Sequence, residues 1–184
     1  MAPAAEVAEP EKGPAPLAPR LPVDVARPVP VMIDVEAEKE RASRLEEVLS
    51  KYRIELRSTA SAKGKALAQE ISTLPFRIGR IVDEGATEMA VPNDLSLRET
   101  RPYYLSRAHY EIDVSEDGTL LVRDLRSRLG TTVNGVSIGR VAPSLKEALR
   151  VGENKLHMGG RHSPHDFILT IAELLPEPPL NLVD

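Results

Sequence analysis

Cysteine is absent from this chain of 184 residues, which excludes disulfide bonds, cysteine-ligated metal sites and thiol catalysis. Tryptophan is absent and aromatic residues make up 3% of the sequence, so a core must be built from valine, isoleucine, leucine and alanine. No apolar run is long enough to span a bilayer. A basic excess is also missing, because 28 acidic residues outnumber 24 lysines and arginines. This balance argues against a nucleic-acid-binding protein, whose footprint is basic.

The first ten residues do not resemble a secretory signal, because they carry Glu6 and Glu9 and no uninterrupted apolar stretch. Together with the missing cysteine, this favours a soluble intracellular protein, and we expect a cytoplasmic location. The composition, 41% hydrophobic and 28% charged, suits one globular domain with some length to spare.

Proline and alanine dominate the N-terminal segment, which has little apolar bulk to offset the entropy of ordering. We predict that residues 1–33 form a disordered tail. A stiff spacer is a better interpretation of this tail than a ligand for aromatic-grooved domains. A second proline cluster predicts a C-terminal tail over residues 176–184.

Helix formers replace proline and glycine over residues 34–51, which predicts an amphipathic helix with Asp34 as its N-cap. Apolar residues at helical spacing form a narrow stripe, namely Ala42, Leu45, Val48 and Leu49. The stripe covers too few turns for a coiled coil, so a helix docked on the domain is favoured over a dimerisation helix.

Short apolar runs separated by turn residues follow from Tyr52 onward, and they predict an all-β sandwich of short, mainly antiparallel strands over residues 52–175. The expected strands are 52–57, 68–73, 76–81, 108–114, 120–124, 132–133, 136–138, 149–151, 154–158 and 166–172.

Three motifs stand at the ends of these strands. The first is Phe76-Arg77-Ile78-Gly79-Arg80, and the second is Leu105-Ser106-Arg107-Ala108-His109. The third runs from Asp124-Leu125-Arg126-Ser127 into Gly130-Thr131-Thr132-Val133-Asn134-Gly135. Each supplies a phosphate-friendly side chain or a glycine that permits a turn or a close approach.

In this order the motifs resemble the forkhead-associated (FHA) domain, a phosphothreonine-peptide binding module. The family pattern is Gly-Arg, then Ser-x-x-His, then Asn-Gly-Thr-x-x-Asn-Gly. The segments 93–97 and 122–125 also resemble the strands that precede the serine and asparagine loops of the family. The resemblance covers roughly residues 52–175 and implies an FHA-like sandwich.

A phosphothreonine receptor needs a guanidinium together with hydroxyl and amide donors, because the phosphate carries nearly two negative charges. Arg80 supplies the guanidinium and Ser106 supplies the hydroxyl. The resemblance implies that both contact the phosphate. Arg107 and Arg128 add positive charge beside the expected site, so the expected phosphopeptide-binding residues are Arg80, Ser106, Arg107 and Arg128.

A second group of residues is expected to brace the loops rather than touch the ligand. The resemblance gives His109 this role, and the glycines and Asn134 suit turns or close approaches. The expected bracing residues are Gly79, His109, Gly130, Thr131, Asn134 and Gly135.

The chain departs from the family pattern at Leu129, where the family has an asparagine that bonds the peptide main chain. Leucine lacks that amide, and losing such a bond costs about tenfold in affinity. Two functions therefore stay open: a phosphothreonine-dependent adaptor in Ser/Thr kinase signalling, or a phosphate-independent interaction module that keeps the fold.

Enzymatic activity is not expected, because no paired carboxylates, nucleophile–base pair or nucleotide loop is present. A cluster of His157, His162, His165 and Asp166 has zinc-ligand chemistry, but its spacing matches no established metal pattern, so we expect no metal or cofactor. No threonine precedes Thr59, which predicts that a phosphothreonine ligand comes in trans, from a kinase or a kinase substrate.

Overall fold

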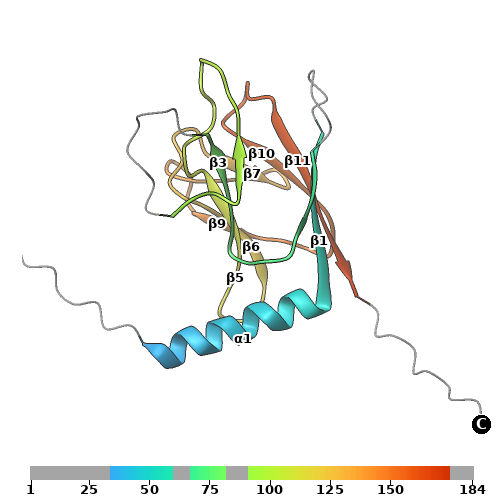
Figure 1. Ribbon diagram of the computed structural model, residues 1–184. Coiled ribbons are helices and arrows are strands. Elements are labelled where there is room, and N and C mark those ends of the chain that lie inside the picture. Colours follow the sequence, from blue (N-terminus) through green and yellow to red (C-terminus); the bar gives the residue numbers. More distant parts are fainter. Residues whose placement is uncertain (1–33, 60–66, 82–90, 175–184) are drawn as a thin grey trace, which may run out of the picture. The chain divides into compact units, whose positions relative to one another are not determined.

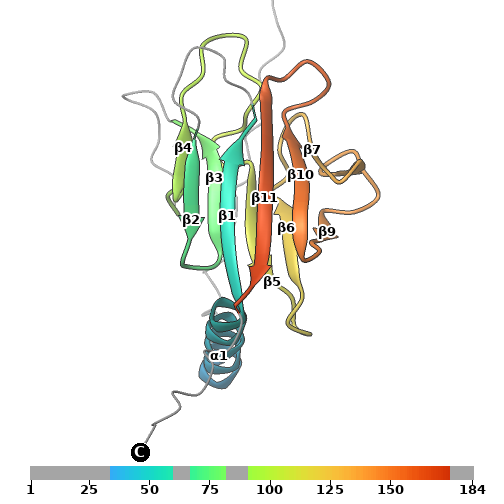
Figure 2. The ribbon, with the colours of Figure 1, turned by 90° about the vertical axis from the view of Figure 1, so that its right-hand side faces the viewer.

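Two β-sheets form the framework of the part of the chain that the computed structural model describes, residues 34–59, 67–81 and 91–174 (Figures 1 and 2). The expectations for residues 1–33 and 176–184 lie outside these residues. One sheet has six strands in the order β2-β1-β11-β10-β7-β8, and the other has five in the order β4-β3-β5-β6-β9. The strand pairs are antiparallel except for β3 with β4. The predicted all-β sandwich is confirmed.

The elements occur in the following order along the chain. They are α1 (Val35–Lys51), β1 (Tyr52–Ser58), β2 (Ala68–Ile71), β3 (Phe76–Arg80), β4 (Leu95–Leu97), β5 (Tyr110–Val114), β6 (Leu120–Asp124), β7 (Thr131–Val133), β8 (Val136–Ile138), β9 (Lys146–Ala148), β10 (Gly152–Met158) and β11 (His165–Glu173).

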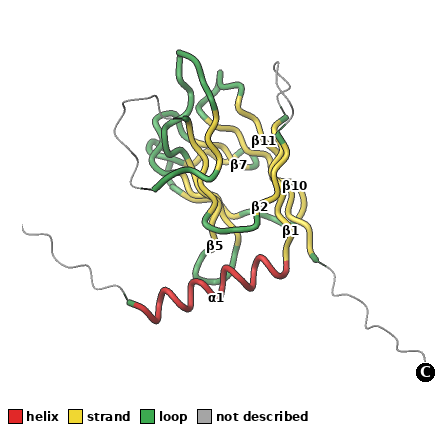
Figure 3. Tube along the Cα trace, in the orientation of Figure 1, coloured by secondary structure: helices red, strands yellow, loops and turns green. Residues whose placement is uncertain are grey.

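Figure 3 shows the strands arranged in two layers. Buried residues from the strands of both layers form one hydrophobic core. Strand alternation points every second side chain inward, and these residues are fully buried, including Ile54 and Leu56 of β1, Ile78 of β3 and Ile112 of β5. Each contributes roughly 1.5–3 kcal/mol by leaving water. As the composition requires, aliphatic side chains fill most of this core.

Helix α1 begins after Asp34, whose carboxylate accepts hydrogen bonds from the backbone N–H groups of Glu36 and Ala37 at 3.1 and 3.2 Å. This is the N-cap that the sequence predicts. Val48 is buried in the core and Leu45 and Leu49 pack against it, so the apolar stripe docks the helix on the sandwich.

Strand β5 is buried on both faces, although its sequence alternates apolar and acidic residues. Its outward side chains Glu111 and Asp113 are covered by arginines from neighbouring elements. Arg77 approaches Glu111 to 3.0 Å, and Arg41 of α1 approaches Asp113 to 3.0 Å. The Arg41–Asp113 ion pair therefore ties α1 to the outer face of the five-stranded sheet.

One expected strand is wrong. Residues 149–151 form no strand. The strand in this region is β9, which begins three residues before the expected start and pairs with β6. Leu149 is buried, whereas Val151 is 53% exposed, so the two apolar residues that suggested a strand face different environments. The remaining expected strands are present with shifts of a few residues at their ends.

Candidate functional site

Loops from both sheets gather at the end of the sandwich that lies away from α1 (Figures 1 and 2). The segment between β4 and β5 carries Ser106, and the segment between β6 and β7 carries Arg128. Arg80 ends β3. Two bonds join the three residues: the Arg80 N–H donates to the Ser106 carbonyl at 3.0 Å, and the Arg128 N–H donates to the Ser106 hydroxyl oxygen at 3.0 Å.

The Arg80 guanidinium stacks on the ring of Tyr103, with its carbon 3.9 Å from the ring centroid. One of its terminal nitrogens also donates to the Ile81 carbonyl at 3.2 Å. Stacking engages the flat face of a guanidinium and leaves its N–H groups directed outward in the plane. The ring therefore orients Arg80 through the flat face of its guanidinium.

Ser106 uses its hydroxyl oxygen as an acceptor for the Arg128 N–H. Within the part of the chain that the structure describes, the hydroxyl hydrogen has no acceptor. A serine hydroxyl both accepts and donates. The side chain is therefore held in place through its oxygen and keeps one donor for a ligand.

His109 joins the loop between β4 and β5, which carries Ser106 and is called the serine loop below, to the loop before β7. Its Nδ1 accepts a hydrogen bond from the Ser106 N–H at 3.0 Å, and its Nε2 lies 3.1 Å from the Gly130 carbonyl. These two partners define a neutral imidazole that carries its hydrogen on Nε2. Burial lowers the pKa of His109 below its usual value, and this outweighs the opposing effects of the Gly130 carbonyl and of nearby carboxylates.

The stabilising effect of His109 is expected to depend on pH. Because its folded-state pKa is lowered, the unfolded chain binds the proton first, and stability falls as pH drops below about 6.5. Wild type should have a higher free energy of unfolding than His109→Gln at about pH 7.5, and this difference should shrink at about pH 5.5. Urea unfolding of both proteins at both pH values measures this. A difference that stays constant or grows contradicts the prediction.

Arg128 and Arg107 lie on either side of Ser106 but differ in their contacts. The Arg128 side chain donates to the Tyr103 carbonyl and so crosses between the two loops. Arg107 is exposed, and its carbonyl accepts from the Asn93 side-chain amide at 2.7 Å. The structure thus brings Arg128 into contact with Ser106 and Tyr103, whereas the Arg107 side chain is exposed.

Gly79 lies where β3 and the serine loop approach most closely. A Cβ atom added there would lie 1.9 Å from the Arg107 carbonyl oxygen and 2.8 Å from the Asn93 side-chain nitrogen. Its φ angle is ordinary, so space rather than backbone conformation demands glycine here.

A buried carboxylate organises the loop from β6 to β7. Asp124 accepts from the Ser127 N–H, the Ser127 hydroxyl and the Thr131 hydroxyl, each at 2.7 Å. Ser127 in turn accepts from the Gly130 N–H at 2.9 Å. Gly130 has a φ of 78° and offers its carbonyl to both His109 and Gly159. This network fixes the position of Arg128 and Leu129.

Asn134 and Gly135 form the two-residue turn between β7 and β8, with φ angles of 51° and 89°. Positive φ at both positions is the geometry that an Asn-Gly hairpin turn favours. The Asn134 side chain donates to Asn154 at 2.9 Å and accepts from the Lys155 N–H at 2.9 Å. Its contacts are thus with β10, away from Arg80 and Ser106.

Sequence reasoning missed Glu99, Tyr103 and Asp124. The buried Glu99 carboxylate accepts from the Tyr104 and Leu105 N–H groups at 3.2 and 2.9 Å and lies 2.6 Å from His165 Nε2. It thereby shapes the approach to Ser106. Asp124 carried a local signal, because Asp followed three residues later by Ser suits a side-chain-capped turn. Glu99 carried none, since its partner His165 lies 66 residues away.

Two histidines of the cluster seen in the sequence, His157 and His165, lie against two different carboxylates. His157 lies 2.7 Å from the Asp166 carboxylate and 2.7 Å from the Gly160 carbonyl. Burial lowers the pKa of His157, but these two acceptors outweigh it and raise the pKa overall. His165 faces Glu99 instead. Within the described residues, no group of three or more metal-ligating side chains comes together.

Comparison with known proteins gives one family. The family model for the FHA domain matches residues 76–152. No curated protein matches the chain.

Among the helices of the described residues, none is both long and apolar enough to cross a membrane.

Several solved structures are similar. The FHA domain of the CT664 protein from Chlamydia trachomatis is 17% identical, with a TM-score of 0.40, over 67% of this chain and 99% of that chain. The N-terminal FHA domain of S. cerevisiae Rad53p, in complex with a phosphothreonine peptide, is 20% identical, with a TM-score of 0.45, over 66% and 94%. Full-length yeast Pml1p is 22% identical, with a TM-score of 0.45, over 67% and 82%.

Proposed function

This chain belongs to the FHA domain family, and from that premise we propose that it binds a phosphothreonine peptide at Arg80 and Ser106. Arg80 provides the permanent charge and a planar fork of donors for the phosphate oxygens. Arg128 provides a second cation beside it. Gly79, His109, Gly130 and Thr131 hold the loops that present these groups, and Asn134 and Gly135 form the turn that joins β7 to β8.

The observation that carries the proposal is the state of the Ser106 hydroxyl. Its acceptor side is occupied by the Arg128 N–H, and its hydrogen has no acceptor among the described residues. A hydroxyl held in this way, next to a stacked arginine, suits an oxygen-rich anion that accepts hydrogen bonds and donates few.

The ligand is supplied by another protein, a kinase or a kinase substrate, and the chain acts as an adaptor in Ser/Thr kinase signalling in the cytoplasm. The argument for a ligand in trans is the absence of threonine before Thr59. Arg107 widens the positive surface at the mouth of the site and strengthens long-range attraction of the phosphopeptide.

Leu129 favours a second candidate, a phosphate-independent interaction module. Its side chain is 42% exposed at the tip of the loop, where it offers an apolar contact and no hydrogen bond. Such a surface suits a partner recognised by shape and apolar area, with the phosphate adding little.

Paired peptides decide between the two candidates. The full chain is titrated with a library of threonine peptides, each prepared with and without phosphate, and binding is followed by fluorescence anisotropy. We expect the phosphorylated member of a binding pair to bind at least about thirtyfold more tightly, because charge-assisted bonds to a desolvated phosphate are worth 2 kcal/mol or more. Equal affinity within each pair would assign the chain to the phosphate-independent class.

A further inference from the structure

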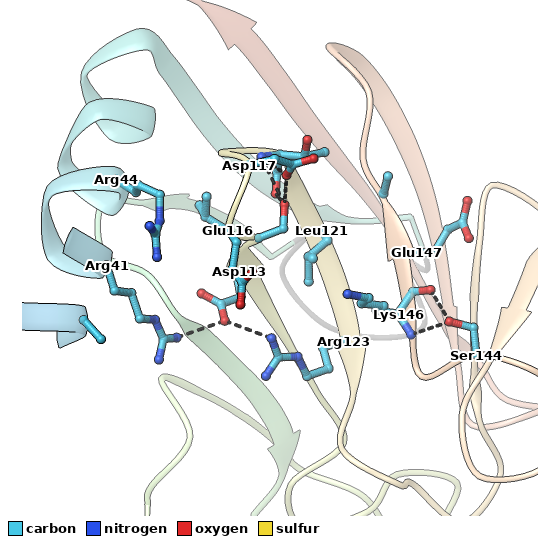
Figure 4. A pocket seen from close by; sticks show the side chains of 15 residues that line it. Arg41, Arg44, Asp113, Glu116, Asp117, Leu121, Arg123, Ser144, Lys146 and Glu147 are labelled. Atoms are coloured by element: carbon cyan, nitrogen blue, oxygen red, sulfur yellow. Dashed lines mark hydrogen bonds and ion pairs between the residues drawn. The ribbon is translucent and has the colours of Figure 1, made fainter. Parts of the chain in front are cut away.

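A groove of about 940 Å³ lies between α1 and the outer face of the five-stranded sheet (Figure 4). Its walls are the middle of α1, the end of β5 with the turn that follows, and strands β6 and β9. This groove is at the α1 end of the sandwich. The end of β3 and the segment between β4 and β5, which carry Arg80 and Ser106, lie at the other end (Figure 1).

Basic side chains reach into this groove from both walls. Arg41 and Arg44 are three residues apart on α1 and so share one face of the helix. On the sheet, Arg123 and Lys146 are direct partners in the β6–β9 register. Figure 4 shows all four turned toward the groove. Like charges directly opposite each other on neighbouring strands are destabilising, so folding alone does not favour this pair.

Four carboxylates also line the groove, but among them only Asp113 forms an ion pair with a lining cation. Asp113 pairs with Arg41 at 3.0 Å and with Arg123 at 3.5 Å, through the same carboxylate oxygen. Arg123 also lies 3.5 Å from Glu111. Within the described part of the chain, the Arg44 guanidinium and the Lys146 ammonium group form no ion pair. These two cations remain uncompensated on opposite walls.

The other acidic residues that line the groove are directed or engaged elsewhere. Glu147 follows Lys146 on β9, so strand alternation sends its side chain to the other face, as Figure 4 shows. Asp117 accepts from the Thr119 N–H at 3.2 Å and from the Ser115 hydroxyl within its own turn. Glu116 is exposed on that turn, at the rim of the groove.

We propose that this groove binds an acidic peptide segment of a partner protein, whose aspartate or glutamate side chains pair with Arg44 and Lys146. The placement of the two cations on facing walls requires a ligand with more than one carboxylate. The groove is also much larger than a single small anion, since 940 Å³ is at the upper end of the range for whole ligand pockets. This interaction is independent of phosphate recognition at Arg80.

The test uses the full chain and a fluorescent peptide of Glu, Asp and Gly that contains no hydroxyl residue. The double variant Arg44→Gln with Lys146→Gln should bind this peptide about tenfold more weakly than wild type does. Added salt should weaken wild-type binding, because exposed charges are screened. Peptide-induced NMR shifts should fall in residues 113–123 and 144–148. The melting temperature of the double variant should not fall, since Lys146→Gln removes a like-charge pair.

A matched control removes the same charge elsewhere. Arg57→Gln with Lys155→Gln, two exposed positions on the six-stranded sheet, should keep affinity within about twofold of wild type. Arg80→Ala should leave acidic-peptide binding unchanged. Phosphopeptide binding at Arg80 and acidic-peptide binding in the groove are therefore tested separately, and one can fail without the other. No binding to wild type, an equal loss in the control pair, or tighter binding of a lysine-rich peptide would each overturn the proposal.

Discussion

Arg80→Ala is expected to weaken phosphothreonine-peptide binding by at least about thirtyfold, to the level of the unphosphorylated peptide. Arg80 is the guanidinium that the structure orients by stacking on Tyr103 and by the backbone bond from its N–H to Ser106. Removing it leaves the phosphate opposite the Ser106 hydroxyl without the guanidinium that stacks on Tyr103. Titration of the phosphorylated and unphosphorylated peptides against both proteins measures the loss.

Two further variants make the result specific. Arg80→Lys keeps the charge but loses the planar fork and the stacking, so its affinity should fall between wild type and Arg80→Ala. Arg53→Ala removes an exposed arginine that pairs with Glu70 on β1 and β2, away from the loops, and should leave affinity unchanged. The backbone bond to Ser106 survives every substitution at Arg80, so the fold should be retained. Unchanged affinity of Arg80→Ala for the phosphopeptide contradicts the assignment.

The fold could be predicted from local sequence because its strands obey simple alternation. β1, β6 and β8 carry apolar residues at every second position or short runs between turns, and the Asn134-Gly135 turn has a local backbone signature. β9 could not be found in this way. Its sequence Lys146-Glu147-Ala148 has no apolar alternation, and it is a strand only because β6 offers an edge to pair with.

The site was predictable only in part, because sequence reveals donors and glycines but not the residues that orient them. Arg80 and Ser106 stand in recognisable motifs. Tyr103 and Glu99 lie in a segment without periodicity, and their roles depend on contacts made after folding, a stacked guanidinium for Tyr103 and a distant histidine for Glu99. The charged groove was hidden for the same reason, since it combines α1 with strands that follow some eighty residues later.

Gly79→Ala is expected to destabilise the protein by about 3 kcal/mol or more, which corresponds to a fall in melting temperature of about 10 °C. The new Cβ atom would meet the Arg107 carbonyl oxygen at 1.9 Å and its carbon at 2.7 Å, and both belong to backbone that cannot rotate away. Relief requires β3 to separate from the serine loop. That movement strains the Arg80–Ser106 bond and the 3.0 Å bond from the His109 N–H to the Ile78 carbonyl.

Gly118→Ala provides the comparison, because Gly118 has a positive φ of 84° but nothing within 4 Å of an added Cβ. Its cost should be only the backbone strain of about 1–2 kcal/mol. Thermal unfolding of the two variants should therefore rank Gly79→Ala as the less stable. In any folded Gly79→Ala protein, the amide resonances of Ser106 and His109 should shift and phosphopeptide affinity should fall, whereas Gly118→Ala should alter neither. A Gly79→Ala protein as stable as Gly118→Ala would show that the serine loop yields to β3 at little cost, and that the close approach does not fix Ser106.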